Sequence, residues 1–231
     1  LQNIDDSGSV LEGKEGINLE VDSLQNNEST IKGGTVIIDA KKDIDNIGAT
    51  IKGRDVQLTS KEGSINNITE AHHYGDSHTA STYIGPTAGI ISENNLVLDA
   101  AQDINIVGAK LKAGGSAVLE AGNDINIETI QDKRATTSTS RDGKTTTNVQ
   151  STTHIGSQID IGGDAYLKTG NDVVISGSEV NVGGSFVADT GGDFKLVSVQ
   201  DTVQTNTESS KSGFGVGGGL WGSQTTQTNE F

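Results

Sequence analysis

Five aspartates recur at equivalent places along the chain, and repeated carboxylates are the first side chains to consider for chemistry. A hydrolase or lyase needs such groups clustered on one face, as paired carboxylates or as basic residues with a calcium ion. Each aspartate here instead precedes a strand at a turn, where Asp satisfies local backbone groups. We therefore expect a structural column of corner residues and no enzymatic activity. The five are Asp43, Asp103, Asp124, Asp172 and Asp193.

Three histidines and an aspartate lie close together in sequence, and imidazole and carboxylate groups are metal ligands. They are His72, His73, His78 and Asp76. Glycine and serine neighbours make this stretch a flexible loop, and no second cluster of ligands follows it. Cysteine is absent, which excludes a thiolate site. We expect no metal and no cofactor.

A segment of about 20 residues recurs along the chain and must position these side chains. Each copy begins with a short strand of alternating apolar and polar residues, an apolar pair follows, and several copies add a third strand. The first strands are residues 34–40, 54–60, 94–100, 115–121, 163–169 and 184–190. The apolar pairs are Ile44 and Ile47, Ile65 and Ile68, Ile104 and Ile106, Ile125 and Ile127, Val173 and Ile175, and Phe194 and Leu196.

The spacing of the copies predicts the fold class. Ala40 and Ser60 are 20 residues apart, and Ala100 and Ala121 are 21 apart. A repeat this short cannot bury its apolar side chains alone, so it must stack on its neighbours. We predict an all-β fold, a right-handed parallel β-helix, with about eight to ten coils at roughly 4.8 Å per coil.

Composition supports this architecture and excludes several alternatives. Aromatic residues make up 3 % of the chain and glycines number 31, which suits a thin aliphatic core with frequent turns. No stretch shows a 3.6-residue period or the roughly twenty apolar residues of a membrane span, so we expect almost no helix and no transmembrane helix. The net charge of −15 argues against nucleic acid, because phosphates require clustered Lys and Arg.

Asparagines also recur in the second strand of several copies. They are Asn46, Asn66, Asn105 and Asn126. We predict a stacked column of these side chains which, if buried, is hydrogen-bonded along the rod.

Polar segments break the period, and we interpret them as β-hairpin excursions from the coils. They cover residues 70–92, 131–153 and 202–231. Asp142-Gly143 is a signal for a two-residue turn in which both central positions have positive φ. This turn would pair Thr139 with Thr146 and Ala135 with Gln150. We expect residues 1–231 to be a single repeat segment and an internal piece of a longer chain.

Aromatic and apolar side chains in the excursions are candidates for contact with a membrane or a partner. Exposed apolar patches usually mark contact sites. Alternatively, the glycine-rich apolar segment near the C-terminus packs back on the rod or caps its end. The candidate contact residues are Tyr74, Tyr83, Phe214, Val216, Leu220 and Trp221.

The coils follow the form Gly-Gly-x-[AFV]-x-[LA]-x-[AT]-Gly-[NG]-Asp-[IVF]-x-[IL], best seen in residues 114–127, 162–175 and 183–196. This motif, interrupted by Ser/Thr-rich excursions, resembles the haemagglutinin repeats of filamentous haemagglutinins and of CdiA-like contact-dependent growth inhibition exoproteins. The likeness covers residues 10–200. It implies a piece of a very long exoprotein, exported by two-partner secretion through an outer-membrane transporter and displayed on the cell surface.

Two functions are compatible with this resemblance. Coils with long hairpins are similar to the second haemagglutinin repeat region, which in growth-inhibition proteins is associated with the target cell's outer membrane. The first hypothesis is a non-enzymatic segment that helps deliver a C-terminal toxin across that membrane. The second is the shaft of a filamentous haemagglutinin adhesin that binds host cells through a surface receptor.

Overall fold

The chain folds into β-strands. A computed structural model describes residues 8–211 and 222–230, and within these ranges it contains strands and turns without a helix, which confirms the predicted all-β fold. No helix in this part of the chain has the length and apolar character needed to span a membrane. The strands form two compact units. The first, here called the rod, comprises residues 8–70, 85–130 and 155–199; the second, the hairpin sheet, comprises residues 71–84, 131–154, 200–211 and 222–230.

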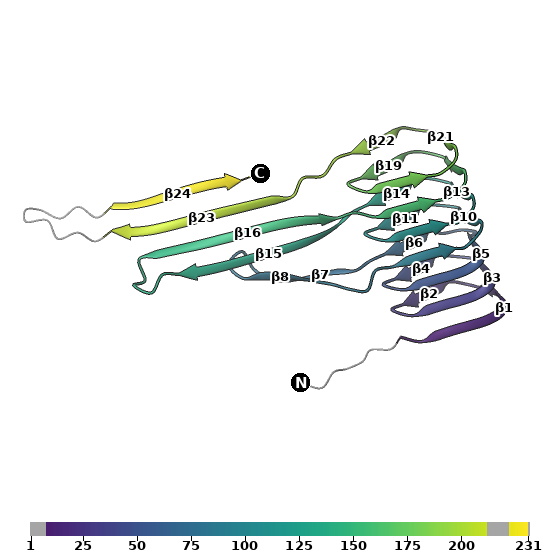
Figure 1. Cartoon of the computed structure of the whole chain (residues 1–231), viewed down its shortest axis with the longest axis horizontal. Helices are drawn as coiled ribbons and strands as arrows, with labels where there is room; N and C mark the ends of the chain where they lie inside the picture. The colour runs from purple at the N-terminus through teal and green to yellow at the C-terminus, as the bar shows by residue number, and fades with distance from the viewer. Residues whose placement is uncertain (1–7, 212–221, 231) are drawn as a thin grey trace, which may run out of the picture. The chain divides into compact units, whose positions relative to one another are not determined.

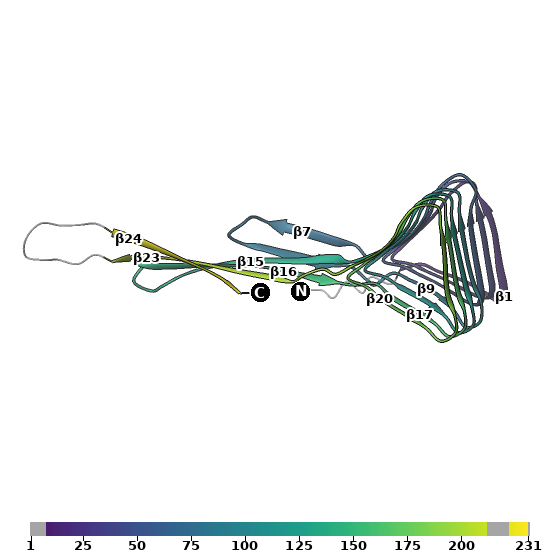
Figure 2. The same ribbon diagram turned by 90° about the horizontal axis from the view of Figure 1, so that it is seen from above.

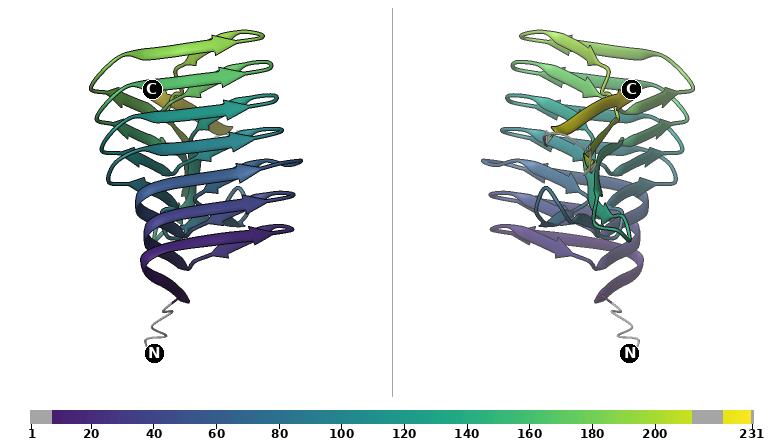
Figure 3. Two further views of the ribbon diagram at one scale, coloured as in Figure 1. Left: turned by 90° about the vertical axis from the view of Figure 1, so that its right-hand side faces the viewer. Right: turned by 90° about the vertical axis from the view of Figure 1, so that its left-hand side faces the viewer.

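The rod is a parallel β-helix whose coils each contribute up to three strands. In the fourth coil these are β10 (Leu96–Ala100), β11 (Ile104–Val107) and β12 (Lys110–Ala113). Each pairs in parallel with its counterpart in the next coil, so that Leu96 lies beside Ala117 and Ile104 beside Ile125. The left panel of Figure 3 shows the resulting stack.

Seven coils are stacked in the described part of the rod, fewer than the eight to ten expected. Six steps of about 4.8 Å give a stack roughly 29 Å high. The second strands of the coils form one sheet in the order β2 (Leu24–Asn27), β4 (Ile44–Ile47), β6 (Ile65–Ile68), β11, β14 (Ile125–Glu128), β19 (Val173–Ser176) and β22 (Phe194–Val197).

The first and third strands of the coils join in a single eleven-stranded sheet. In the first two coils the third strand runs on into the first strand of the next coil without a break, and seen from above the coils superpose as a triangle (Figure 2). The first strands are β1 (Val10–Val21), β3 (Thr30–Ala40), β5 (Thr50–Ser60), β10, β13 (Ala117–Ala121), β18 (Ala165–Thr169) and β21 (Phe186–Thr190). The separate third strands are β9 (Gly89–Ser92), β12, β17 (Gln158–Ile161) and β20 (Glu179–Val182).

One copy of the first strand was not predicted from the sequence. Residues 16–21 of β1 lie in register with residues 35–40 of β3, so that Ile17 pairs with Val36. An irregularity in the pairing between Gly13 and Gly16 precedes this stretch. Lys14 and Glu15 lie where β3 has Gly34 alone, so one extra residue interrupts the regular pattern of the repeat.

The core is a thin column of aliphatic side chains from alternate strand positions. In β3, Val36, Ile38 and Ala40 are fully buried, while the residues between them are partly exposed. Successive side chains of a strand point to opposite faces, so one set fills the narrow interior. Burial of this kind recurs in every coil up to β19. The stability of the rod is therefore distributed along the stacked coils.

Two of the predicted apolar pairs are wrong. Ile47 and Ile68 are partly exposed, whereas Asn46 and Asn67 are buried. Ile44 and Ile47 are three residues apart, and a strand period of two places them on opposite faces. The buried partner of Ile44 is therefore Asn46.

A single residue with left-handed backbone closes the corner after the second strand wherever no hairpin is inserted. Gly48, Gly108 and Gly177 have φ of 56°, 56° and 53°, and Glu28 has φ of 47° at the same place in the first coil. Glycine adopts this conformation without the steric cost of a Cβ.

The three hairpins replace this corner on alternate coils. They follow β6, β14 and β22, which belong to the third, fifth and seventh coils. The connectivity thus supplies one two-stranded hairpin for every two coils.

The hairpin sheet has six strands (Figure 1). Their pairings are antiparallel, as between His72 and Tyr83 and between Thr147 and Thr207. Gly89–Ser92, which the turn pattern placed in the first excursion, is β9 of the rod. The strand order is β24 (Gly222–Glu230), β23 (Thr202–Lys211), β16 (Thr145–Ile155), β15 (Ile130–Thr139), β8 (Ala80–Ile84) and β7 (Ala71–Gly75).

Candidate contact surface

The recurrent aspartates form a column at one corner of the rod, as predicted. The backbone N–H of Asp193 donates to Oδ1 of Asp172 at 2.7 Å, and that of Asp172 donates to Asp124 at 2.9 Å. Asp124 donates in turn to Asp103 at 3.2 Å, and Asp43 accepts from the following coil in the same way. The carboxylates of Asp43, Asp103, Asp124 and Asp172 thus each join one coil to the next.

The recurrent asparagines form two columns where one was predicted. Asn66, Asn105 and Asn126 stack on the outer side of the second strands, with amide-to-amide bonds of 2.8 and 3.0 Å. Asn46 belongs to a separate, buried column with Asn26 and Asn67. The difference of one residue in register moves a side chain from one face of the strand to the other.

Two of the predicted contact residues project from the first hairpin. Tyr74 and Tyr83 are 58 % and 56 % exposed. Strand pairing places Tyr83 beside His72 and Tyr74 beside Ser81, so all four occupy one face of the hairpin. The rings of His72 and Tyr83 stack with centroids 6.4 Å apart. The other four predicted contact residues lie outside the described residues; they are Phe214, Val216, Leu220 and Trp221.

The histidines of this hairpin take part in local structure. His73 Nδ1 lies 2.8 Å from the hydroxyl of Thr82. Oδ1 of Asp76 accepts the backbone N–H groups of His78 and Thr79, which lowers the pKa of this carboxyl group and closes the turn. Among the described residues, no three His, Asp or Glu side chains gather in a way that could hold a metal ion.

The turn of the second hairpin differs from the predicted type. The Thr139 and Thr146 hydroxyls are 3.3 Å apart, which agrees with the predicted pairing. Gly143 has φ of 68°, but Asp142 has no positive φ, so a two-residue turn with both central residues left-handed is wrong. The N–H of Gly143 instead bonds to the carbonyl of Ser140 within a wider loop.

Strands β16 and β23 give the hairpin sheet two chemically different faces. On one face, here called the threonine face, the cross-strand pairs are Thr145 with Ser209, Thr147 with Thr207, Val149 with Thr205, and Ser151 with Val203. On the other, the amide face, they are Thr146 with Glu208, Asn148 with Asn206, Gln150 with Gln204, and Thr152 with Thr202. The alternation of Thr and Ser with Asn and Gln is present in the sequence of each strand and is the signal that predicts the two faces.

The tip of the first hairpin lies on the amide face. Asn148 and Gln150 donate to the carbonyl of Ser77 at 2.9 and 3.1 Å, and the hydroxyl of Thr137 donates to the carbonyl of His78 at 2.8 Å. These contacts occupy amide groups that would otherwise face solvent.

The threonine face keeps its larger apolar side chains in solvent. Val149 is 37 % exposed and Val203 is 45 % exposed. A hydroxyl contact of 3.4 Å joins Thr147 to Thr207 between the two strands. This face therefore presents methyl and isopropyl groups with few charges, and it is the strongest candidate for contact with a partner.

Fold and surface together define a class: a parallel β-helix with polar hairpins inserted at alternate coils. The hemagglutinin repeat family matches residues 12–92, 72–145 and 140–214, and the chain belongs to this family. It is a CdiA-like haemagglutinin repeat region, as the coil motif predicted. No solved structure matches it.

Curated relatives support the same assignment. The chain is 39 % identical over 138 residues to the tRNA nuclease CdiA of Escherichia coli O6:K15:H31, a match covering 54 % of this chain and 4 % of that protein. It is 39 % identical over 116 residues to the 16S rRNA endonuclease CdiA of Enterobacter cloacae, covering 47 % of this chain and 4 % of that protein. The chain thus spans about 4 % of the length of the relatives it matches.

Proposed function

We propose that this chain is a non-enzymatic segment of a two-partner-secretion exoprotein that engages the outer membrane of a target cell and helps deliver a toxin carried elsewhere in the protein. The family match and the CdiA relatives support the exoprotein assignment. The threonine face of the hairpin sheet is the observation that supports membrane engagement.

The chemistry of that face suits an interface of intermediate polarity. A backbone in a membrane must satisfy its own hydrogen bonds, and strands of an antiparallel sheet satisfy theirs through pairing. Threonine hydroxyls can bond locally while their methyl groups meet lipid or another sheet. The inner coils of the rod are already paired on both sides and offer less to a partner.

The carboxylates of the rod support the absence of enzymatic activity. The carboxylates of Asp103, Asp124 and Asp172 each accept a backbone N–H group of the next coil. An acid–base pair needs groups free to exchange protons with a substrate. The nuclease activities in the relatives' names belong to proteins of which this chain matches about 4 %.

Export and location follow from the same proposal. An outer-membrane transporter is the expected partner during secretion, and the segment is expected at the bacterial surface, in contact with a target-cell membrane or receptor.

A host adhesin is the second candidate, and the first hairpin favours it. Tyr74 and Tyr83 are exposed on one face beside His72. Aromatic rings displayed in this way provide flat apolar surfaces for sugars or for protein side chains. In this alternative the rod is the shaft of a filamentous haemagglutinin.

Flotation distinguishes the two proposals. The chain is mixed with Gram-negative outer-membrane vesicles and compared with a variant lacking residues 71–84, 129–155 and 200–231. Flotation of the complete chain that disappears in the variant supports delivery at the membrane. If the folded chain fails to float, the delivery proposal is wrong and the adhesin takes precedence.

A further inference from the structure

A basic groove lies on the outer surface of the rod, where β1, β3 and β5 turn a corner. Its volume is about 470 Å³. Four cationic side chains and two carboxylates line it, an excess of two positive charges in a chain of net charge −15. The cations are Lys14, Lys32, Lys52 and Arg54, and the carboxylates are Glu12 and Glu93.

The register of the strands leaves part of this charge uncompensated. Glu12, Lys32, Lys52 and Ile91 occupy one column on successive strands. Lys32 is paired with Glu12 at 2.8 Å, but Lys52 lies between Lys32 and Ile91. Like charges on directly opposed residues destabilise a sheet, so an anion beside Lys52 would relieve this repulsion.

Two further cations flank Lys52, and carboxylates of the chain neutralise little of their charge. Arg54 Nε reaches Asp55 only at 3.4 Å, and the Arg54 side chain is 60 % exposed. Lys14 is exposed within the irregular stretch of β1. Within the described part of the chain, neither Lys14 nor Lys52 forms an ion pair.

Glycines let the coils approach closely beneath the groove. A Cβ added at Gly33 would lie 2.9 Å from the carbonyl oxygen of Gly13, and one added at Gly53 would lie 3.1 Å from that of Gly34. A Cβ at either position would also meet a core side chain, Ile17 or Val36, so the coils approach closely on the inner side of the strands that carry the cations.

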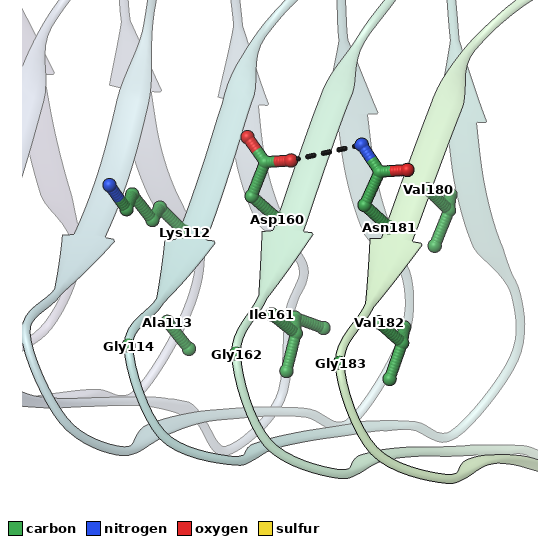
Figure 4. Close-up of a pocket in the computed structure, with 10 residues that line it drawn as sticks. All are labelled: Lys112, Ala113, Gly114, Asp160, Ile161, Gly162, Val180, Asn181, Val182 and Gly183. Carbon is green, nitrogen blue, oxygen red and sulfur yellow. Dashed lines mark hydrogen bonds between the residues drawn. The ribbon is translucent and has the colours of Figure 1, made fainter.

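The same column has a different character at the other end of the rod. Figure 4 shows Lys112, Asp160 and Asn181 on successive strands. Asn181 donates to Asp160 at 3.1 Å, and Gln158 donates to the same carboxylate at 2.9 Å. Polar side chains at that end are hydrogen-bonded to one another, whereas cationic side chains outnumber carboxylates in the basic groove.

We propose that the basic groove binds a phosphate group. An arginine beside lysines matches the charge and the several acceptor oxygens of a phosphomonoester. The phosphate can belong to the headgroup of a membrane lipid or to a soluble molecule. This site is independent of the hairpin sheet, so it can exist whether or not the proposed function is right.

Calorimetry with sodium pyrophosphate at low ionic strength tests the proposal on the complete chain. Lys52→Glu with Arg54→Glu is expected to weaken binding about tenfold or more. Lys41→Glu with Lys61→Glu is the matched control, because both residues are exposed, lie elsewhere, and change the net charge equally. Lys52→Gln with Arg54→Gln repeats the test without charge reversal, and circular dichroism verifies folding of every variant.

Vesicles distinguish the two sources of phosphate. Flotation with phosphatidylethanolamine vesicles containing phosphorylated lipid A, blocked by pyrophosphate, supports a lipid headgroup. Pyrophosphate binding without flotation supports a soluble phosphate compound. Absence of both, or equal weakening by the control pair, contradicts a phosphate site in this groove.

Discussion

The side-chain amide of Asn46 donates a hydrogen bond to Oδ1 of Asn67 at 2.8 Å, inside a core that is otherwise largely aliphatic. Asn26 donates to Asn46 at 2.7 Å from the preceding coil. The Asn46 amide also reaches the carbonyl of Ala49 at 2.9 Å. Buried polar groups are tolerated when they are hydrogen-bonded, so this ladder holds three consecutive coils in register.

Asn46→Ala is expected to destabilise the rod by about 1–3 kcal/mol, because it leaves the Asn26 amide and the Asn67 oxygen without their partner. Urea unfolding followed by circular dichroism measures the change. Asn105→Ala removes an equivalent link from the partly exposed outer ladder. Water can replace that link, and we expect a cost below about 1 kcal/mol. Equal costs at both positions would contradict the role of the buried ladder.

Gly108→Ala is expected to destabilise the closed corner of the fourth coil. Its φ is 56°, and an added Cβ would lie 2.8 Å from Cγ1 of Ile130. The strained backbone alone costs about 1–3 kcal/mol. Gly143→Ala is the comparison, since it also has positive φ but no atom within 4 Å of the added Cβ. Thermal unfolding should show a larger loss for Gly108→Ala, and the reverse order would contradict this account of the corner.

Acid is expected to weaken the last coils of the rod. The N–H of Asp193 and then the ammonium of Lys195 hold the pKa of Asp172 below its ordinary value of 3.8. A lowered pKa in the folded state means that protonation favours unfolding, so this contribution is present above the unfolded pKa and is lost as pH falls through the folded pKa.

Asp172→Asn tests this assignment. The variant retains an acceptor for Asp193 but has no group that titrates at this position. Melting temperatures between about pH 2 and pH 6 should fall less steeply for the variant than for the parent chain. Parallel curves would show that Asp172 does not contribute to the acid sensitivity.

Deleting residues 129–155 is expected to close the corner of the fifth coil. The deletion joins Glu128 to Gly156-Ser157, which reproduces the Gly177-Ser178 corner of the next coil. The rod should retain its circular dichroism, whereas β8 and β23 lose the strands between them and should exchange amide hydrogens faster.

Gly156→Ala in the shortened chain is the control for this design. Gly156 must adopt the left-handed conformation to close the corner, so the added Cβ should lower the melting temperature. No effect of this substitution would show that the shortened chain closes in another way.

Much of the rod could be predicted from the sequence because its determinants are local. The spacing of Ala40, Ser60, Ala100 and Ala121 predicts the coil, and the aspartates before the second strands predict the corner column. The alternation of apolar and polar side chains within each strand predicts which residues face the core, and it requires no knowledge of contacts between distant residues.

The errors arise where hydrophobicity and strand period disagree. Ile47 is more apolar than Asn46, yet the period buries Asn46, and its hydrogen bonds compensate for its polarity. The first strand of the first coil, residues 16–21, was not predicted because the irregularity after Gly13 interrupts the repeat. The basic groove was equally hidden, because Lys14, Lys52 and Arg54 converge only after the coils are stacked.

Flotation of Val149→Lys with Val203→Lys tests the central claim most directly. Both changes place a charge on the threonine face, while Thr202→Lys with Gln204→Lys adds the same charge to exposed positions of the amide face. If the threonine face engages the outer membrane, the first pair abolishes flotation with outer-membrane vesicles and the second pair preserves it. Retention of flotation by the first pair, with both variants folded, would contradict the proposal.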